Sequence, residues 1–190
     1  MSSNFTVVYD ACVLYPAPLR SLLMYLALTD MFRARWSDLI HDEWIRNLLK
    51  KRPDLTEEKL IRTRDLMNKH IRGCLVTGFE PLITAINLPD PDDRHVVAAA
   101  IHTRAEGIIT FNLKDFPEES LGPFNIKAIH PDEFIMDLMD LNIGKVIEAA
   151  RNHRSSLKNP TFTADAYLDC LLKQQLPQSV SRLREFTVMI

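Results

Sequence analysis

The sequence predicts an α/β fold with a central, mostly parallel sheet flanked by helices, followed by a helical C-terminal extension. Short segments rich in β-forming residues alternate with longer segments of helical periodicity, a pattern typical of parallel sheets. From Pro131 onward only helical patterns occur. The chain has 190 residues, 46% of them hydrophobic, which is enough for a sizeable core. We expect two parts, residues 1–135 and residues 136–190.

The individual elements follow from composition and spacing. Runs of β-forming residues bounded by polar ones predict strands at 5–9, 34–37, 107–111 and 126–130. Apolar residues at helical spacing predict helices that begin at Leu19, at Ser37 or Asp38, at about residue 56 and among the acids at 90–93. We expect Gly107 to end the last of these helices. The same spacing at 143–150 and 167–172 predicts helices in the C-terminal extension.

Charge and cysteine content limit the possible classes of protein. The formal net charge of −2 does not indicate nucleic-acid binding, but it does not exclude a local basic face. Cys12, Cys74 and Cys170 lack the spacing of a zinc site or a disulfide framework. The N-terminus has no signal-peptide pattern, and the apolar segment 22–28 is too short to span a bilayer. We therefore expect a cytoplasmic protein that does not enter a membrane.

Four acidic residues occupy places where a parallel sheet could gather them. Asp10 interrupts an apolar run at the end of the first strand, Asp93 lies at the start of a helix, and Asp115 follows the strand at 107–111. Glu43 lies near the start of the second helix. Each has a simpler explanation: Asp10 as a helix cap, Asp93 together with Asp90 and Asp92 as cap and dipole residues, Asp115 as a turn residue and Glu43 as a solvated acid.

The joint placement of these acids suggests a metal site. Carboxylates that converge at the carboxyl edge of a sheet repel one another strongly unless a cation neutralises them. Oxygen ligands without His or Cys partners favour Mg²⁺ or Mn²⁺ over zinc. Carboxylate-bound Mg²⁺ is a common device of phosphate-ester chemistry. His41 and His95, which lie near these acids in the sequence, are expected to be helix residues rather than general bases.

Three segments together resemble the PIN-domain family, closest to the branch that includes the VapC-type toxins of bacterial toxin–antitoxin pairs. The segments are VVYDACVLYPAPLR, RWSDLIHDEWIRNL and LPDPDDRHVVAAAIHTRAEGIITFNLKDFP. The similarity covers about residues 5 to 135 with the motifs in the family's order. The helical C-terminal extension also resembles one carried by some members of this branch. The resemblance implies a PIN-like three-layer fold.

The resemblance also implies an activity, that of a Mg²⁺- or Mn²⁺-dependent endoribonuclease. Matched to the family's motif, the catalytic and metal-binding acids are Asp10, Glu43, Asp93 and Asp115. They are implied to hold one or two metal ions and to position a water for attack on an RNA phosphodiester. Asp92 competes with Asp93 for the third position, and Asn112 is a supporting polar group. Cys12 departs from the pattern, because this position usually carries Asn, Ser or Thr.

An acidic pocket needs basic residues around it to attract RNA. The candidates for phosphate contacts are the basic residues Arg20, Arg46, Lys50, Lys51, Arg52, Arg62, Arg64, Lys69 and Arg72. Arg20, Arg46, Lys50 and Arg52 are the first choices, and a solvated mixed-charge helix face is the alternative. Trp36 and Trp44 are aromatic residues that could stack on a base, but core packing is the simpler expectation. The resemblance further implies a cognate antitoxin as partner, with a segment that crosses the active-site groove. The C-terminal helices or the helix at 56–72 could form its docking surface or the interface of a homodimer.

Three other functions were weighed against a toxin ribonuclease. A PIN-type nuclease could process RNA without any antitoxin. A non-catalytic module could use the acidic pocket only for binding. A phosphatase of the haloacid-dehalogenase type also places an acid after the first strand, but it needs a second acid two residues later, where this chain has Cys12.

Overall fold

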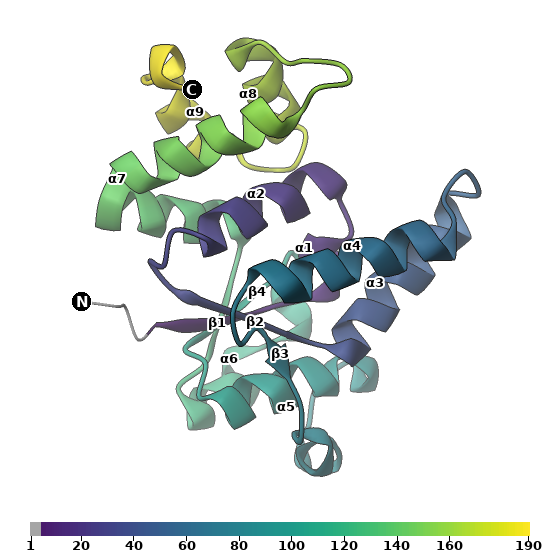
Figure 1. Ribbon diagram of the computed structural model, residues 1–190. Coiled ribbons are helices and arrows are strands. Elements are labelled where there is room, and N and C mark those ends of the chain that lie inside the picture. Colours follow the sequence, from purple (N-terminus) through teal and green to yellow (C-terminus); the bar gives the residue numbers. More distant parts are fainter. Residues whose placement is uncertain (1–4) are drawn as a thin grey trace.

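A computed structural model describes residues 5–190 and shows five strands in one sheet (Figure 1). The strands are β1 (Thr6–Tyr9), β2 (Arg33–Ser37), β3 (Leu75–Val76), β4 (Gly107–Ile109) and β5 (Lys127–Ile129). They lie in the order β3-β2-β1-β4-β5, and every neighbouring pair is parallel. The predicted α/β fold is confirmed, and the sheet is parallel throughout.

Helices cover both faces of this sheet. The α-helices within residues 5–190 are α1 (Ala11–Leu14), α2 (Ala17–Ala27), α3 (Asp38–Lys51), α4 (Glu57–His70), α5 (Arg94–Thr103), α6 (Glu118–Leu121), α7 (Pro131–Ser156), α8 (Ala164–Leu172) and α9 (Pro177–Arg184). The last two, α8 and α9, lie beyond α7 and away from the sheet (Figure 1). Figure 1 shows α2 and α7 above the sheet and α5 and α6 below it. On the upper face Tyr9 Oη donates a hydrogen bond to Leu23 O at 3.2 Å, and on the lower face α5 contacts three strands.

The central strand β1 is buried on both faces, as the apolar run in its sequence suggests. The Tyr9 ring stacks on Trp36 of β2 with 6.0 Å between ring centroids. Trp36 is fully buried and donates from Nε1 to Asn68 Oδ1 of α4 at 2.7 Å, so it is a core residue. This packing fixes the carboxyl end of β1 as the rigid centre of the molecule.

Helix α3 begins where the sequence predicts. Ser37, the last residue of β2, is the N-cap, and its hydroxyl accepts a hydrogen bond from Ile40 N at 3.3 Å. The acidic Asp38 lies in the first turn, and Lys50 and Lys51 lie in the last turn, which suits the helix dipole. Glu43 is the sixth residue of this helix, so the helix fixes the position of its backbone.

The predicted end of α5 at Gly107 is wrong. The helix ends at Thr103, and Arg104 adopts the left-handed conformation with φ of 53° as its C-cap. Gly107 is instead the first residue of β4, and a Cβ there would stand 2.9 Å from Ile129 Cδ1 of β5. The glycine therefore serves the close packing of two strands, and the helix closes without it.

The C-terminal region is helical, as predicted, apart from one isolated bridge between Lys158 and Thr161. Helix α7 is kinked at Asn142, where φ is −161° and ψ is 90°. Asp132, near its start, accepts hydrogen bonds from Gln178 N at 2.9 Å and Ser179 N at 2.8 Å at the start of α9. The boundary expected after residue 135 stays a prediction and lies within the first turns of α7.

Within residues 5–190, no helix has both the length and the apolar character needed to cross a bilayer.

Candidate active site

The site lies where the direction of the chain changes within the sheet. Strand β1 is paired with β2 on one side and with β4 on the other, so the segments leaving β1 and β4 run apart. Crevices of this kind, outside the carboxyl ends of parallel strands, are the usual ligand sites of open α/β sheets. Asp10 directly follows β1, and Thr110 directly follows β4.

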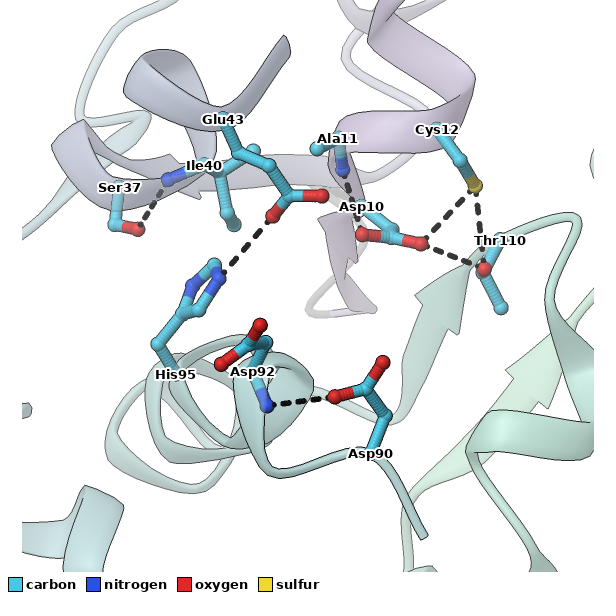
Figure 2. Close-up of polar contacts among 10 residues, drawn as sticks. All are labelled: Asp10, Ala11, Cys12, Ser37, Ile40, Glu43, Asp90, Asp92, His95 and Thr110. Carbon is cyan, nitrogen blue, oxygen red and sulfur yellow. Dashed lines mark hydrogen bonds and ion pairs between the residues drawn. The ribbon is translucent and has the colours of Figure 1, made fainter. Parts of the chain in front are cut away.

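Asp10 is only 2% exposed and is held by three hydrogen-bond donors. Its Oδ1 accepts from Ala11 N at 2.6 Å, which caps α1. Its Oδ2 accepts from Thr110 Oγ1 at 2.7 Å and from Cys12 Sγ at 3.0 Å (Figure 2). Burial raises the pKa of Asp10, the hydrogen bonds from Cys12 and Thr110 oppose this increase, and the nearby Glu43 carboxylate adds to it. The hydrogen bonds therefore fix the orientation of the Asp10 carboxylate, while burial and the Glu43 charge disfavour its ionised form.

Cys12, which departs from the family pattern, acts as a hydrogen-bonding side chain. Burial and the neighbouring Asp10 charge raise the pKa of this thiol far above its ordinary value, so the sulfur keeps its proton and can donate it to Asp10. The sulfur also accepts from Phe111 N at 3.2 Å, beyond the end of β4. Cys12 thus donates a hydrogen bond to Asp10 from the position at which the resemblance leads us to expect Asn, Ser or Thr.

Glu43 and His95 face each other across the crevice. Glu43 projects from α3 and His95 from α5, and Glu43 Oε2 lies 3.3 Å from His95 Nε2. The other ring nitrogen, His95 Nδ1, is buried and has no hydrogen-bond partner among the residues that the structure describes. The pair ties the two helices together at the mouth of the site and orients the Glu43 carboxylate.

The three aspartates that precede α5 have different environments. Asp90 caps the short 3₁₀ turn η2 (Pro91–Asp93) by accepting from Asp92 N at 2.9 Å. Asp92 is exposed, whereas Asp93 is half-buried and occupies the N-cap position of α5 without making a capping hydrogen bond. A role as cap therefore explains Asp90, but it does not explain Asp93, whose carboxylate makes no capping hydrogen bond.

The other acids near Asp93 act on its ionisation. Burial, followed in order by the negative charges of Asp10, Asp90, Glu43 and Asp115, together raise the pKa of Asp93 to about 7. All four acids expected at the site therefore share one electrostatic environment. In the view of Figure 2, Asp10 and Glu43 lie on one side of the crevice and Asp90 and Asp92 on the other.

Asp115 reaches the site from the segment that follows β4. It is half-buried and ends the 3₁₀ turn η3 (Leu113–Asp115), where its backbone N donates to Asn112 O at 2.9 Å. Asn112 has an exposed side chain, and its backbone N donates to Thr110 Oγ1 at 3.0 Å. The Thr110 hydroxyl therefore connects the turn that carries Asp115 with the Asp10 carboxylate.

The donor set fits a hard divalent cation better than it fits any other common ligand. Its members are carboxylates, the pKa values of Asp10 and Asp93 are raised, and within residues 5–190 none of the four expected acids forms an ion pair with Lys or Arg. Across the same residues, no three His, Cys, Asp or Glu side chains stand close enough together to enclose a metal ion. The acids thus share a cleft and repel one another without forming a closed cage.

The four basic residues expected to contact RNA occupy different positions. Arg46 and Lys50 are exposed on α3. Arg52 is exposed but paired with Asp54, with 2.6 Å between Nη2 and Oδ2. Arg20 is 8% exposed, donates to Leu14 O at 2.7 Å, and packs over the buried Trp44 ring. Arg46 and Lys50 are therefore the two whose charges face solvent without a partner among residues 5–190.

Comparison with known proteins identifies the family. The family model described as "PIN domain" matches residues 6–114, which is more than half of the chain and contains β1 to β4. The chain belongs to the PIN-domain family.

The C-terminal region of this PIN-domain protein also has a counterpart. The family model described as "VapC50 C-terminal domain" matches residues 131–185, which correspond to α7, α8 and α9. Among curated proteins, the chain is similar to "Putative ribonuclease VapC50" of Mycobacterium tuberculosis (strain ATCC 25618 / H37Rv), with 41% identity over 107 residues. The match covers 56% of this chain and 62% of that relative, less than two thirds of its length. No solved structure matches the chain.

Thr110 is the member of this PIN-domain site that the sequence analysis did not anticipate. The signal was present, because Thr110 is a polar residue at the end of a buried strand, as Asp10 is. Its partner is 100 residues away in the chain, so no local pattern connects the two. His41, by contrast, is buried and bonded to Trp44 Nε1 at 3.0 Å, as expected of a helix residue.

Proposed function

We propose that this protein is a Mg²⁺- or Mn²⁺-dependent endoribonuclease of the VapC type that cleaves RNA in the cytoplasm. One observation carries the proposal: a PIN domain in which Asp10, Glu43, Asp93 and Asp115 lie near one another and, within residues 5–190, none of them is paired with Lys or Arg. Proteins of this family are typically metal-dependent. The similarity to a protein described as a ribonuclease supports RNA as the substrate.

In this proposal the four acids are the metal ligands, with Asp92 and Asn112 as secondary candidates. A bound divalent cation would polarise the phosphoryl oxygen and supply an activated water. The chain holds the Asp10 carboxylate in place through Ala11, Cys12 and Thr110, so it need not reorganise when substrate arrives. His95 restrains the Glu43 carboxylate in the same way. Arg46 and Lys50 are placed to attract the RNA backbone.

The first test is cleavage of a set of RNAs with and without Mg²⁺ or Mn²⁺. We expect Asp10→Asn and Asp93→Asn to lower the cleavage rate at least about a hundredfold, because each removes a charged ligand. Asp137→Asn is the control, since Asp137 is an exposed acid on α7 with no proposed role at the site, and it should retain activity. Equal cleavage by all these proteins would rule out the assignment of the acids.

A second readout of the same variant does not depend on catalysis. The folded-state pKa of Asp93 is about 7 and its ordinary value is 3.8, so the folded protein binds this proton more tightly than the unfolded chain does. Without metal, wild type should lose stability as pH rises from about 4 to about 7, by about 1–2 kcal/mol after allowance for solvent screening. Asp93→Asn should lack this loss in urea unfolding at matched pH, and parallel pH profiles would contradict the expectation.

We further propose that the nuclease is the toxin of a toxin–antitoxin pair, with residues 1–135 as the nuclease domain and 136–190 as its helical extension. Growth arrest on expression of wild type, but not of Asp10→Asn, would support a toxin, and rescue by a small protein encoded upstream would identify the antitoxin. Active cleavage without growth arrest would favour an RNA-processing nuclease. RNA binding without cleavage would favour a non-catalytic module. Sedimentation of the purified chain tests for a homodimer.

A further inference from the structure

A groove beside the carboxylate crevice has no role in the function proposed so far. It has a volume of about 450 Å³ and opens between the α1–α2 turn, α3 and α4. In Figure 1, α4 runs alongside α3. Tyr15 and Pro16 form one wall, and Leu48, Leu55 and Leu60 form an apolar floor. The groove therefore offers an apolar surface with an aromatic ring at its edge.

Tyr15 is tied directly to the carboxylate site by a single short helix. Asp10 is the N-cap of α1 and Tyr15 is its C-cap, and Tyr15 N donates to Ala11 O at 2.9 Å. At the rise of an α-helix, the five steps from Asp10 to Tyr15 span about 7.5 Å. Arg20 donates from Nη1 to Tyr15 O at 3.4 Å, which restrains the turn between α1 and α2. The half-buried ring is thus held close to the acids.

The rim of the groove is basic. Lys51 Nζ lies 5.8 Å from the centre of the Tyr15 ring, and Lys59 lines the groove from α4. Neither lysine forms a salt bridge within residues 5–190. Along α3, Arg46 and Lys50 follow Glu43 by three and seven residues and so share its side of the helix. A row of positive charge therefore runs from the carboxylates toward the groove.

We propose that this groove binds the nucleotide next to the cleaved bond of a single-stranded RNA. The base stacks on Tyr15, and the adjoining phosphates lie between Lys51 and Lys59. A stacking ring flanked by unpaired cations is the usual means of holding single-stranded nucleic acid without reading its sequence. An acidic peptide would use the lysines but would gain little from the half-buried Tyr15 ring. The inference rests on the proposed ribonuclease function and adds how its substrate is positioned.

The test measures binding of a fluorescent RNA hexanucleotide by anisotropy in an Asp10→Asn background, which prevents cleavage. We expect Tyr15→Ala to weaken binding roughly tenfold, the scale of one stacked base, and Tyr15→Phe to retain it. Lys51→Gln should weaken binding and also reduce its dependence on salt. Phe124→Ala, which truncates an exposed aromatic residue in the α6–β5 segment, is the matched control and should bind as the background does.

Cleavage kinetics with the Asp10 side chain intact separate this inference from the proposed function. Tyr15→Ala should raise KM for the hexanucleotide about tenfold with little change in kcat, and should not affect a dinucleotide that spans only the cleaved bond. If Tyr15→Ala matches wild type in both binding and KM while Asp10→Asn abolishes cleavage, the inference fails and the ribonuclease stands. If no RNA is cleaved but Tyr15→Ala still weakens binding, the groove stands as an RNA site and the ribonuclease fails. Equal displacement of the RNA by a poly-glutamate peptide would overturn the inference in favour of a protein partner.

Discussion

Both carboxylate oxygens of Asp10 accept hydrogen bonds, and this explains how the residue can cap a helix and also belong to the acidic cluster. One carboxylate oxygen caps α1, while the other accepts from Cys12 and Thr110. A cap and a member of the acidic cluster were alternative interpretations of this residue, and the structure shows that it caps a helix while also lying in the cluster. The role of Cys12 could not be predicted from local sequence, because its partners Thr110 and Phe111 lie about 100 residues away.

At the scale of single residues, Thr110→Val tests the support of Asp10. The substitution keeps the shape of the side chain but removes a donor that lies 2.7 Å from a buried carboxylate oxygen. We expect the Mg²⁺ concentration for half-maximal cleavage to rise about 10- to 100-fold, as is typical when a group that orients a ligand is lost. Thr110→Ser, which keeps the hydroxyl, should behave as wild type. An unchanged Mg²⁺ requirement in Thr110→Val would show that Ala11 and Cys12 are sufficient.

At the scale of elements, prediction succeeded where a local signal exists. Helix α3 begins at Ser37 and Asp38 as expected, because a capping hydroxyl and a first-turn acid are visible in the sequence. The end of α5 was misplaced, because Arg104 closes the helix in a conformation that gives no sequence signal. Strand β3 was not anticipated, since its two residues are too few for a pattern and pair only through β2. Helix α1, with four residues, is also too short for a periodic pattern.

The cap of α5 gives a prediction about stability. Arg104 has φ of 53°, a conformation that L-residues adopt at a cost and glycine adopts freely. We expect Arg104→Gly to increase the free energy of unfolding by about 0.5–1 kcal/mol. Urea unfolding measures the change, with Arg104→Ala as the control that removes the side chain but keeps the strain. A gain of equal size in both variants would assign the effect to the arginine side chain instead of the backbone.

At the scale of the whole molecule, the α/β class and the helical C-terminal region were predictable from alternation alone, but the way they join was not. Helix α7 packs on α2, and Lys145 Nζ donates to Thr29 O at 2.7 Å just beyond the end of α2. Asp132 holds the start of α9 through two backbone N–H groups. Such contacts depend on how helices fold back on one another, which spacing along the chain does not reveal.

Asp132 offers a test of how the C-terminal helices are held. It is 2% exposed, and its carboxylate accepts two short hydrogen bonds from the start of α9. We expect Asp132→Ala to lower the free energy of unfolding by about 2–4 kcal/mol, because buried backbone donors would lose charged partners. Asp137→Ala, at an exposed position of the same helix, should change it by less than about 0.5 kcal/mol. Similar unfolding midpoints for the two variants would contradict this role.

The separation of Asp10 and Thr110 along the chain also bears on when the crevice can come into existence. During synthesis, Asp10 and Glu43 are the first two of the four acids to be made, and the remaining two appear only with Asp93 and Asp115. The hydrogen bond that orients Asp10 requires β4 to dock beside β1, a contact that must close a loop of 100 residues. A growing chain therefore has an incomplete acid set until its 115th residue is in place.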